Sequence, residues 1–220
     1  MRKSQASKSW RCTRSCGHSL AKSEIKEGTM MEGKKVIITG VPGVGKTTVV
    51  NEALKKIREE GIEYKSINFG TFMFEVALND KIVQDRDQMR TLDRAVQKRL
   101  QQRAAQAIGQ VPGNLLIDTH ASVKTPKGYL AGLPEWVLRE IMPDCIVLVE
   151  TDDDQILMRR LTDETRSRDK EGARSIGEHQ QFNRSVAAAY AMLTGCTVKI
   201  VINADFLLER AAEDMAVVLR

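Results

Sequence analysis

The residues with the clearest capacity for chemistry form the stretch G-V-P-G-V-G-K-T, which runs from Gly40 to Thr47. This is the G-x-x-x-x-G-K-[ST] spacing, in which glycines let successive backbone N–H groups point at phosphate oxygens. Lys46 supplies a point charge for the β- and γ-phosphates, and the Thr47 hydroxyl is placed to ligate Mg²⁺. The stretch therefore predicts a binding site for a nucleoside triphosphate. Its phosphate-binding residues are predicted to be Gly40, Val41, Pro42, Gly43, Val44, Gly45, Lys46, Thr47 and Thr48.

A phosphate-binding loop of this kind needs a strand before it and a helix after it. The β-branched residues 36–39 predict a buried parallel strand, and residues 47–60 carry a helical pattern that Gly61 terminates. An ordinary glycine-rich turn between a strand and a helix is the alternative. The full motif in the expected context favours phosphate binding.

A carboxylate is the second chemical signal. Asp118 directly follows three apolar residues, Leu115-Leu116-Ile117, and so is predicted to end a strand. A phosphate-binding loop needs an acid near its Thr to hold Mg²⁺ directly or through water, and ligands sit outside the carboxyl ends of parallel strands. Asp118 fits this role, although it could also cap the loop that follows it.

Two groups of arginines carry the third signal. Arg86 and Arg90 lie in one charged segment, and Arg159, Arg160, Arg166 and Arg168 lie in another. Phosphoryl transfer needs charge neutralisation around the transferring group, and guanidinium groups provide it bidentately. Each arginine taken singly is more often a solvated surface charge. Together with the loop and Asp118, they favour a kinase with a phosphate-bearing acceptor over a simple ATPase. No N-K-x-D or H-R-D motif is present, which argues against a GTPase and a protein kinase.

The remaining pattern alternates strands and helices. Further strands are predicted at residues 62–69, 115–118, 146–149 and 198–202, and a loop at 119–133. Further helices are predicted at residues 71–78, 93–107, 134–141, from 152, 176–193 and 206–219. Five strands that alternate with helices predict an α/β fold, with a five-stranded parallel sheet and helices on both of its faces.

The charge distribution argues against a nucleic-acid-binding face on the body of the protein. The chain has 220 residues and a net charge of +5. Residues 1–33 hold seven Lys and Arg residues against three Glu residues, so most of the excess belongs to this N-terminal part. No run of about 18 apolar residues predicts a membrane span.

Residues 1–30 show no sustained hydrophobic period, and we expect them to be disordered. Cys12, Cys16 and His18 resemble three quarters of a zinc site, without a fourth ligand nearby. The basic composition also fits an organellar transit peptide, and Met30 or Met31 could be the real start. These alternatives stay open.

Several long segments together resemble the archaeal-type adenylate kinases. They are GVPGVGKTT, INFGTFMFEVA, DRDQMRTLD, IDTHASVKTPKGYLAGLP, ETDDDQILMRRL and TRSRD. The resemblance covers residues 34–220 and implies one P-loop kinase domain there, after a basic extension at 1–33. It implies a monophosphate-binding segment at about 68–110 and a short lid at about 159–178. It also implies Mg²⁺-dependent transfer between ATP and AMP to give two ADP, in the cytoplasm, by a homotrimer.

The resemblance also implies roles for individual residues. Thr47 and Asp118 would serve the Mg²⁺ shell, partly through water. The AMP-binding residues would be Phe69, Gly70, Thr71, Arg86, Arg90 and Lys124. The catalytic residues would be Lys46, Arg90, Arg159, Arg166 and Arg168.

Two departures from the bacterial pattern bear on these roles. Ser122 stands where the bacterial enzymes carry an arginine, and we hypothesise that Lys124 or Lys127 supplies that charge. The segment TFMFEVAL also lacks the arginine of the bacterial monophosphate helix. Two alternatives remain, a kinase for another nucleoside monophosphate and a nucleotide-gated ATPase acting in ribosome or RNA assembly.

Overall fold

The structure is a computed structural model that describes residues 33–162 and 172–220. Five parallel strands form its central sheet in the spatial order β2-β3-β1-β6-β7. The strands are β1 (Lys35–Thr39), β2 (Lys65–Asn68), β3 (Leu115–Asp118), β6 (Cys145–Glu150) and β7 (Thr197–Ile202). This arrangement confirms the predicted five-stranded parallel sheet.

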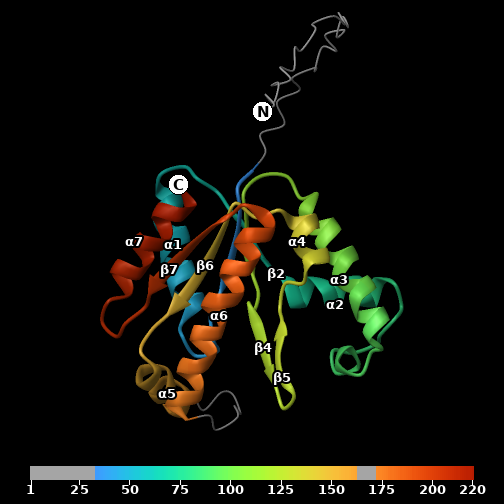
Figure 1. Cartoon of the computed structure of the whole chain (residues 1–220). Helices are drawn as coiled ribbons and strands as arrows, with labels where there is room; N and C mark the ends of the chain where they lie inside the picture. Colours follow the sequence, from blue (N-terminus) through green and yellow to red (C-terminus); the bar gives the residue numbers. More distant parts are fainter. Residues whose placement is uncertain (1–32, 163–171) are drawn as a thin grey trace, which may run out of the picture. The chain divides into compact units, whose positions relative to one another are not determined.

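Helices cover both faces of the sheet (Figure 1). They are α1 (Lys46–Glu59), α2 (Phe69–Asn79), α3 (Arg94–Gly109), α4 (Glu135–Ile141), α5 (Asp153–Thr162), α6 (Ala173–Thr194) and α7 (Leu208–Leu219), with the 3-10 turn η1 (Gln88–Arg90). Side chains of the central strands alternate between the faces. Val36 and Ile38 pack with α1 and α7, whereas Ile37 packs with α3, α4 and α6. The β-branched run is therefore buried on both sides, as predicted.

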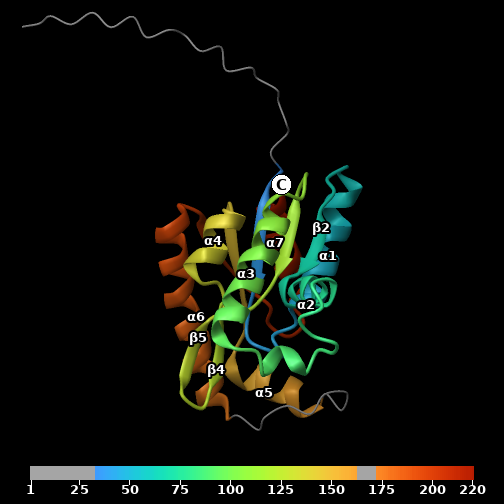
Figure 2. The ribbon, with the colours of Figure 1, turned by 90° about the vertical axis from the view of Figure 1, so that its right-hand side faces the viewer.

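A two-stranded antiparallel hairpin interrupts the region that we predicted to be a loop. Its strands are β4 (Ser122–Thr125) and β5 (Gly128–Ala131). The prediction was wrong because both strands are only four residues long and mostly not buried, and Ser122 forms hydrogen bonds with α6, far along the chain. In both views the hairpin and α5 lie at the end of the domain where the strands of the central sheet end (Figures 1 and 2).

Three predicted boundaries were also wrong. The helix predicted at 71–78 begins at Phe69, because the Asn68 side chain accepts a hydrogen bond from the Thr71 N–H at 3.0 Å and caps it. The strand before it, predicted at 62–69, ends at Asn68. The last helix begins at Leu208 and not at Phe206, because Phe206 has a left-handed backbone with φ of 64°.

The C-terminal end of α3 is anchored to α4 and to the sheet. A Cβ atom on Gly109 would lie 2.3 Å from the Glu140 carbonyl oxygen, so the two helices touch through their backbones there. The Lys35 ammonium donates to the Gly109 carbonyl at 3.0 Å, and the Trp136 indole donates to Gln101 at 3.1 Å. Buried α3 residues occur from Leu100 onward, so the other end of the helix is less supported.

Some predictions lie outside the described residues. These are the suggested zinc ligands Cys12, Cys16 and His18, the nature of the N-terminal extension, and the arginines Arg166 and Arg168. Within the described parts of the chain, no group of His, Cys, Asp and Glu side chains has a metal-binding arrangement. No helix in those parts has the length and apolarity needed to cross a membrane.

Candidate active site

The phosphate-binding loop joins the end of β1 to the start of α1. Gly43 and Gly45 both have left-handed backbones, with φ of 93° and 86°, which a side chain would disfavour. Gly45 is the N-cap of α1, so the first N–H groups of the helix, which have no intrahelical acceptors, open toward the loop. Thr47 and Thr48 are exposed there. This is the geometry that binds phosphate at a helix N-terminus.

Two side chains hold the loop from its protein side. The Val44 carbonyl accepts one hydrogen bond from the Asn203 amide at 2.8 Å and another from the Arg159 guanidinium at 3.1 Å. Asn203 is buried, and a Cβ atom on Gly45 would lie 2.5 Å from its Nδ2 atom. The backbone of the loop is therefore fixed before any nucleotide binds.

Arg159 is held by three partners from two elements. Besides Val44, its guanidinium donates to the Asn203 carbonyl at 3.0 Å and to the Asp205 carboxylate at 3.0 Å. The neighbouring Arg160 donates to the Pro42 carbonyl at 2.8 Å. The structure thus brings both arginines of α5 to the phosphate-binding loop, whereas the catalytic role of Arg159 stays a prediction.

Lys46 and Asp118 form an ion pair at the mouth of the loop. The Lys46 Nζ atom lies 2.9 Å from Asp118 Oδ1, and the two residues come from α1 and the end of β3. Oδ1 is buried and accepts no directed hydrogen bond among the described residues, so the ammonium is its only close charge partner there. A carboxylate oxygen and the hydroxyl of the exposed Thr47 are oxygen donors of the kind that Mg²⁺ prefers.

The other oxygen of Asp118 faces β2. The Asn68 amide donates to Asp118 Oδ2 at 3.1 Å, and the two residues are register partners on neighbouring strands. Asn68 is also the N-cap of α2. One side chain therefore lies between the Lys46–Asp118 pair and the first turn of the helix that the prediction assigned to AMP.

His120 lies two residues beyond Asp118. Loss of solvation lowers the pKa of its imidazole, and the nearby Lys46 ammonium lowers it further. The next residue, Ala121, donates its N–H to the buried Thr39 hydroxyl at 2.7 Å, which ties the chain after β3 to the end of β1. A neutral imidazole thus borders the site at neutral pH.

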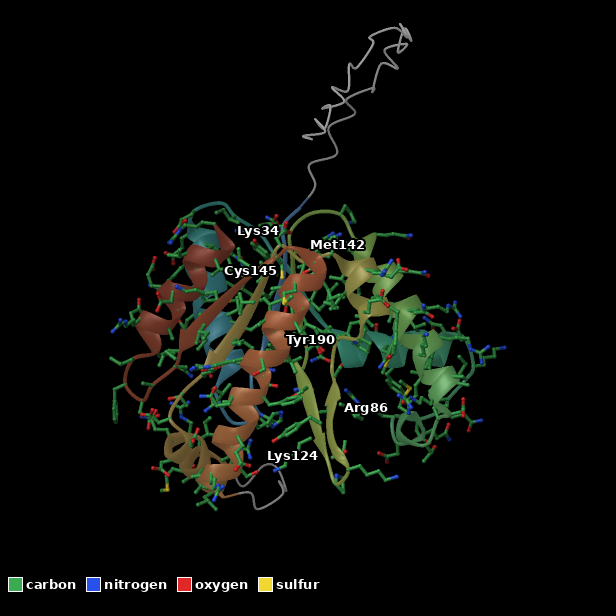
Figure 3. All side chains as sticks on the ribbon, in the orientation of Figure 1. Lys34, Arg86, Lys124, Met142, Cys145 and Tyr190 are labelled. Carbon is green, nitrogen blue, oxygen red and sulfur yellow. The ribbon has the colours of Figure 1, made fainter. Side chains whose placement is uncertain are left out.

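The residues predicted to bind AMP differ in how open they are. Phe69 is buried in the core, so its backbone and not its ring is available, whereas Gly70 is exposed. The Arg86 guanidinium is exposed and makes no hydrogen bond or ion pair with the described residues. Arg90 lies in η1. Arg86, labelled in Figure 3, lies in the segment between α2 and η1.

Lys124 lies on β4 of the hairpin and is labelled in Figure 3. Its ammonium donates to the Ser175 hydroxyl on α6. Ser122, at the position of the bacterial arginine, is buried and bonded to His179 at 3.1 Å and to Asn183 at 2.6 Å. Ser122 therefore anchors the hairpin to α6 and presents no charge to the site.

Three side chains at the site were missed by the sequence analysis, namely Asn68, Asn203 and Asp205. Asn68 and Asn203 each stand at or just after the end of a strand, as Asp118 does. The argument that found Asp118 would have found both asparagines if it had been applied to polar residues other than acids.

Known proteins resemble this chain in sequence and in fold. Residues 39–177 match the family model described as "AAA domain". The adenylate kinase of Methanoculleus marisnigri is 64% identical over 192 residues, which cover 86% of this chain and 100% of that protein. The adenylate kinase of Methanocaldococcus jannaschii is 54% identical over the same length and coverage. A shikimate kinase from Bacteroides thetaiotaomicron superposes with a TM-score of 0.51 at 10% identity, over 84% of this chain and 98% of that one.

Proposed function

This chain belongs to the adenylate kinase family, and we propose that its phosphate-binding loop and the segment beyond β2 hold ATP and AMP with their phosphates end to end. The chain is a nucleoside monophosphate kinase with a P-loop kinase fold. In the reaction, an AMP phosphate oxygen attacks the γ-phosphorus of ATP. The bond from that phosphorus to the bridging oxygen breaks, and two ADP molecules result.

The Lys46–Asp118 pair is the observation that carries this proposal. Its 2.9 Å contact lies between the phosphate-binding loop and Asn68, which opens the segment assigned to AMP. A charge at this point faces both the triphosphate and the acceptor. Phosphoryl transfer depends on such positioning and electrostatic stabilisation more than on covalent assistance.

The residues around this pair have separate tasks in the proposal. Backbone N–H groups of the loop and the Lys46 ammonium bind the β- and γ-phosphates, and Arg159 holds the loop in shape from Val44. Arg86 and Arg90 neutralise the AMP phosphate. Thr47 and Asp118 would hold Mg²⁺, which when bound neutralises charge on the β- and γ-phosphates. Arg166, Arg168 and Lys124 stay predictions for the closed state.

Family membership also supports three coarser proposals about the whole protein. It supports a domain at 34–220 with a monophosphate-binding segment at 68–110 and a lid at 159–178. It also supports a homotrimer and a cytoplasmic location. Gel filtration coupled to light scattering tests for the homotrimer, because a trimer has three times the mass of the 24.6 kDa chain.

The decisive experiment measures ADP formation from ATP and Mg²⁺ with and without AMP. We expect ADP to form rapidly only when AMP is present, for the full chain and for a variant that lacks residues 1–30. CMP, UMP and GMP, offered in turn, are expected to react far more slowly. ATP hydrolysis that does not depend on AMP would contradict the proposal and favour a nucleotide-gated ATPase.

A further inference from the structure

We infer that Asn68 is a positioning residue that couples the start of α2 to the Asp118–Lys46 pair. The inference rests on the proposed function, because it assigns a task to a side chain within the same site. Asn68 belongs to neither the phosphate-binding loop nor the group of arginines. It lies at the point where the acceptor segment leaves the sheet.

Three contacts in series connect α2 to the phosphate-binding loop. The Thr71 N–H donates to Asn68 Oδ1 at 3.0 Å, and Asn68 Nδ2 donates to Asp118 Oδ2 at 3.1 Å. Asp118 Oδ1 then lies 2.9 Å from Lys46 Nζ. Each heavy atom of one amide and of one carboxylate therefore has a separate partner, and the series crosses from α2 to α1.

The amide has only one orientation that serves both of its neighbours. Thr71 offers an N–H and requires the oxygen, whereas the Asp118 carboxylate requires the NH₂ group. The opposite orientation would place two donors face to face and two acceptors face to face. Asn68 and Asp118 are also register partners on β2 and β3, so the sheet fixes the distance that the amide spans.

Through this arrangement, the position of α2 influences the orientation of the Asp118 carboxylate. Because Asn68 is the N-cap, its side chain follows the first turn of the helix whenever that turn shifts. The bond to Oδ2 sets the rotation of the Asp118 carboxylate, and this rotation decides where Oδ1 points relative to Lys46. Binding at the acceptor segment thus acts on the charges that serve the triphosphate.

Matched variants separate the two roles of Asn68, which are to cap α2 and to donate a hydrogen bond to Asp118. Asn68→Ser keeps an N-cap acceptor, but a hydroxyl cannot reach Thr71 and Asp118 at the same time. Asn68→Asp keeps the cap and replaces the donor with a second carboxylate beside Asp118. Asn114→Ser is the control, since the Asn114 amide also joins two groups, accepting from the Lys34 N–H at 2.9 Å and donating to the Glu63 carbonyl at 3.1 Å, next to the opposite end of β3 from Asp118.

For the full-length Asn68→Ser variant, we expect kcat of ADP formation to fall about 10- to 100-fold, the usual cost of losing a side chain that orients a catalytic group. Its midpoint of thermal unfolding and its KM for ATP are expected to stay close to those of the unmodified protein. For Asn114→Ser we expect the reverse, with a midpoint lower by about 2–4 °C and an unchanged kcat.

For Asn68→Asp, kcat is expected to fall at least as far as for Asn68→Ser. The reason is that the second carboxylate removes the donor to Asp118 Oδ2 and repels the Asp118 carboxylate. A normal kcat for both Asn68→Ser and Asn68→Asp would overturn the inference and leave Asn68 as a helix cap only. Failure of the unmodified protein to form ADP from ATP and AMP would instead refute the proposed function, so the two failures are distinguishable.

Discussion

Two arginines of identical chemistry show how differently the two sides of the site are built. On the triphosphate side, the Arg159 guanidinium uses all three nitrogens, on Val44, Asn203 and Asp205. On the acceptor side, the Arg86 guanidinium makes no hydrogen bond or ion pair with any described residue. The triphosphate side is preorganised, so it binds with little ordering cost. If Arg86 binds AMP as proposed, its side chain is ordered only when AMP binds, which would couple binding there to conformational change.

The largest expected effect comes from the residue at the boundary between the two sides. Lys46→Met removes the ammonium and keeps the length of the side chain, so kcat is expected to fall about 10³-fold. The midpoint of thermal unfolding is expected to fall modestly while the fold survives, because the buried Asp118 Oδ1 atom loses its close charge partner. Steady-state assays with ATP and AMP measure the first effect, and calorimetry measures the second. Near-full activity of the variant would remove Lys46 from the catalytic role.

Arg159→Ala tests the preorganised side. Loss of the guanidinium leaves the Asp205 carboxylate without its partner and the Val44 carbonyl with Asn203 alone. We expect stability to drop by about 1–2 kcal/mol and KM for ATP to rise about tenfold. Urea unfolding and initial rates at varied ATP check both. A loss of activity with unchanged stability would mean that Arg159 does not shape the loop.

Arg86→Ala tests the acceptor side, as Arg159→Ala tests the triphosphate side. No contact with the described residues is lost, so the unfolding midpoint should stay the same. KM for AMP is expected to rise about 10- to 100-fold, because a charged hydrogen bond to phosphate is removed. Titration of AMP at saturating ATP measures this. An equal rise in KM for ATP would contradict the division of the site into two sides.

Arg220→Ala gives the smallest expected effect and lies away from both sides. Hydrogen bonds from the exposed Arg220 guanidinium lower the pKa of the Glu60 and Glu213 carboxyl groups. Carboxyl groups with a lowered folded-state pKa stabilise the fold above their unfolded pKa, and that contribution is lost as the pH falls through the folded value. The midpoint of thermal unfolding of the variant should therefore be slightly lower than that of the unmodified protein at neutral pH. This difference should vanish at acidic pH. Thermal scans across this range check the sign.

The sequence predicted the triphosphate side better than the acceptor side, for a physical reason. The residues that form the loop are contiguous, and a strand and a helix on either side follow from local pattern alone. The arginines Arg159 and Arg160 reach that loop across more than a hundred residues, which only their clustering suggested.

The hairpin and the asparagines could not be found in the same way. Ser122 is buried by His179 and Asn183, which follow it by 57 and 61 residues, so no short-range pattern marks β4 as a strand. Asn203 acts through the backbone of Val44, and a contact of this kind leaves no periodic trace in the sequence. Asn68 had a local signal, because asparagine commonly caps helices, but the helix was predicted to begin three residues later.

Because the C-terminal end of α3 is anchored, a rotation of this helix would displace its N-terminal end most. Backbone contact between Gly109 and Glu140 holds that end of the helix in place. The helix extends from this contact for 16 residues, or about 24 Å. A tilt of about 10° at this contact would move the Arg94 end by about 4 Å, which is similar to the width of a phosphate group. A small rotation where the two helices touch would therefore produce a much larger displacement at the Arg94 end.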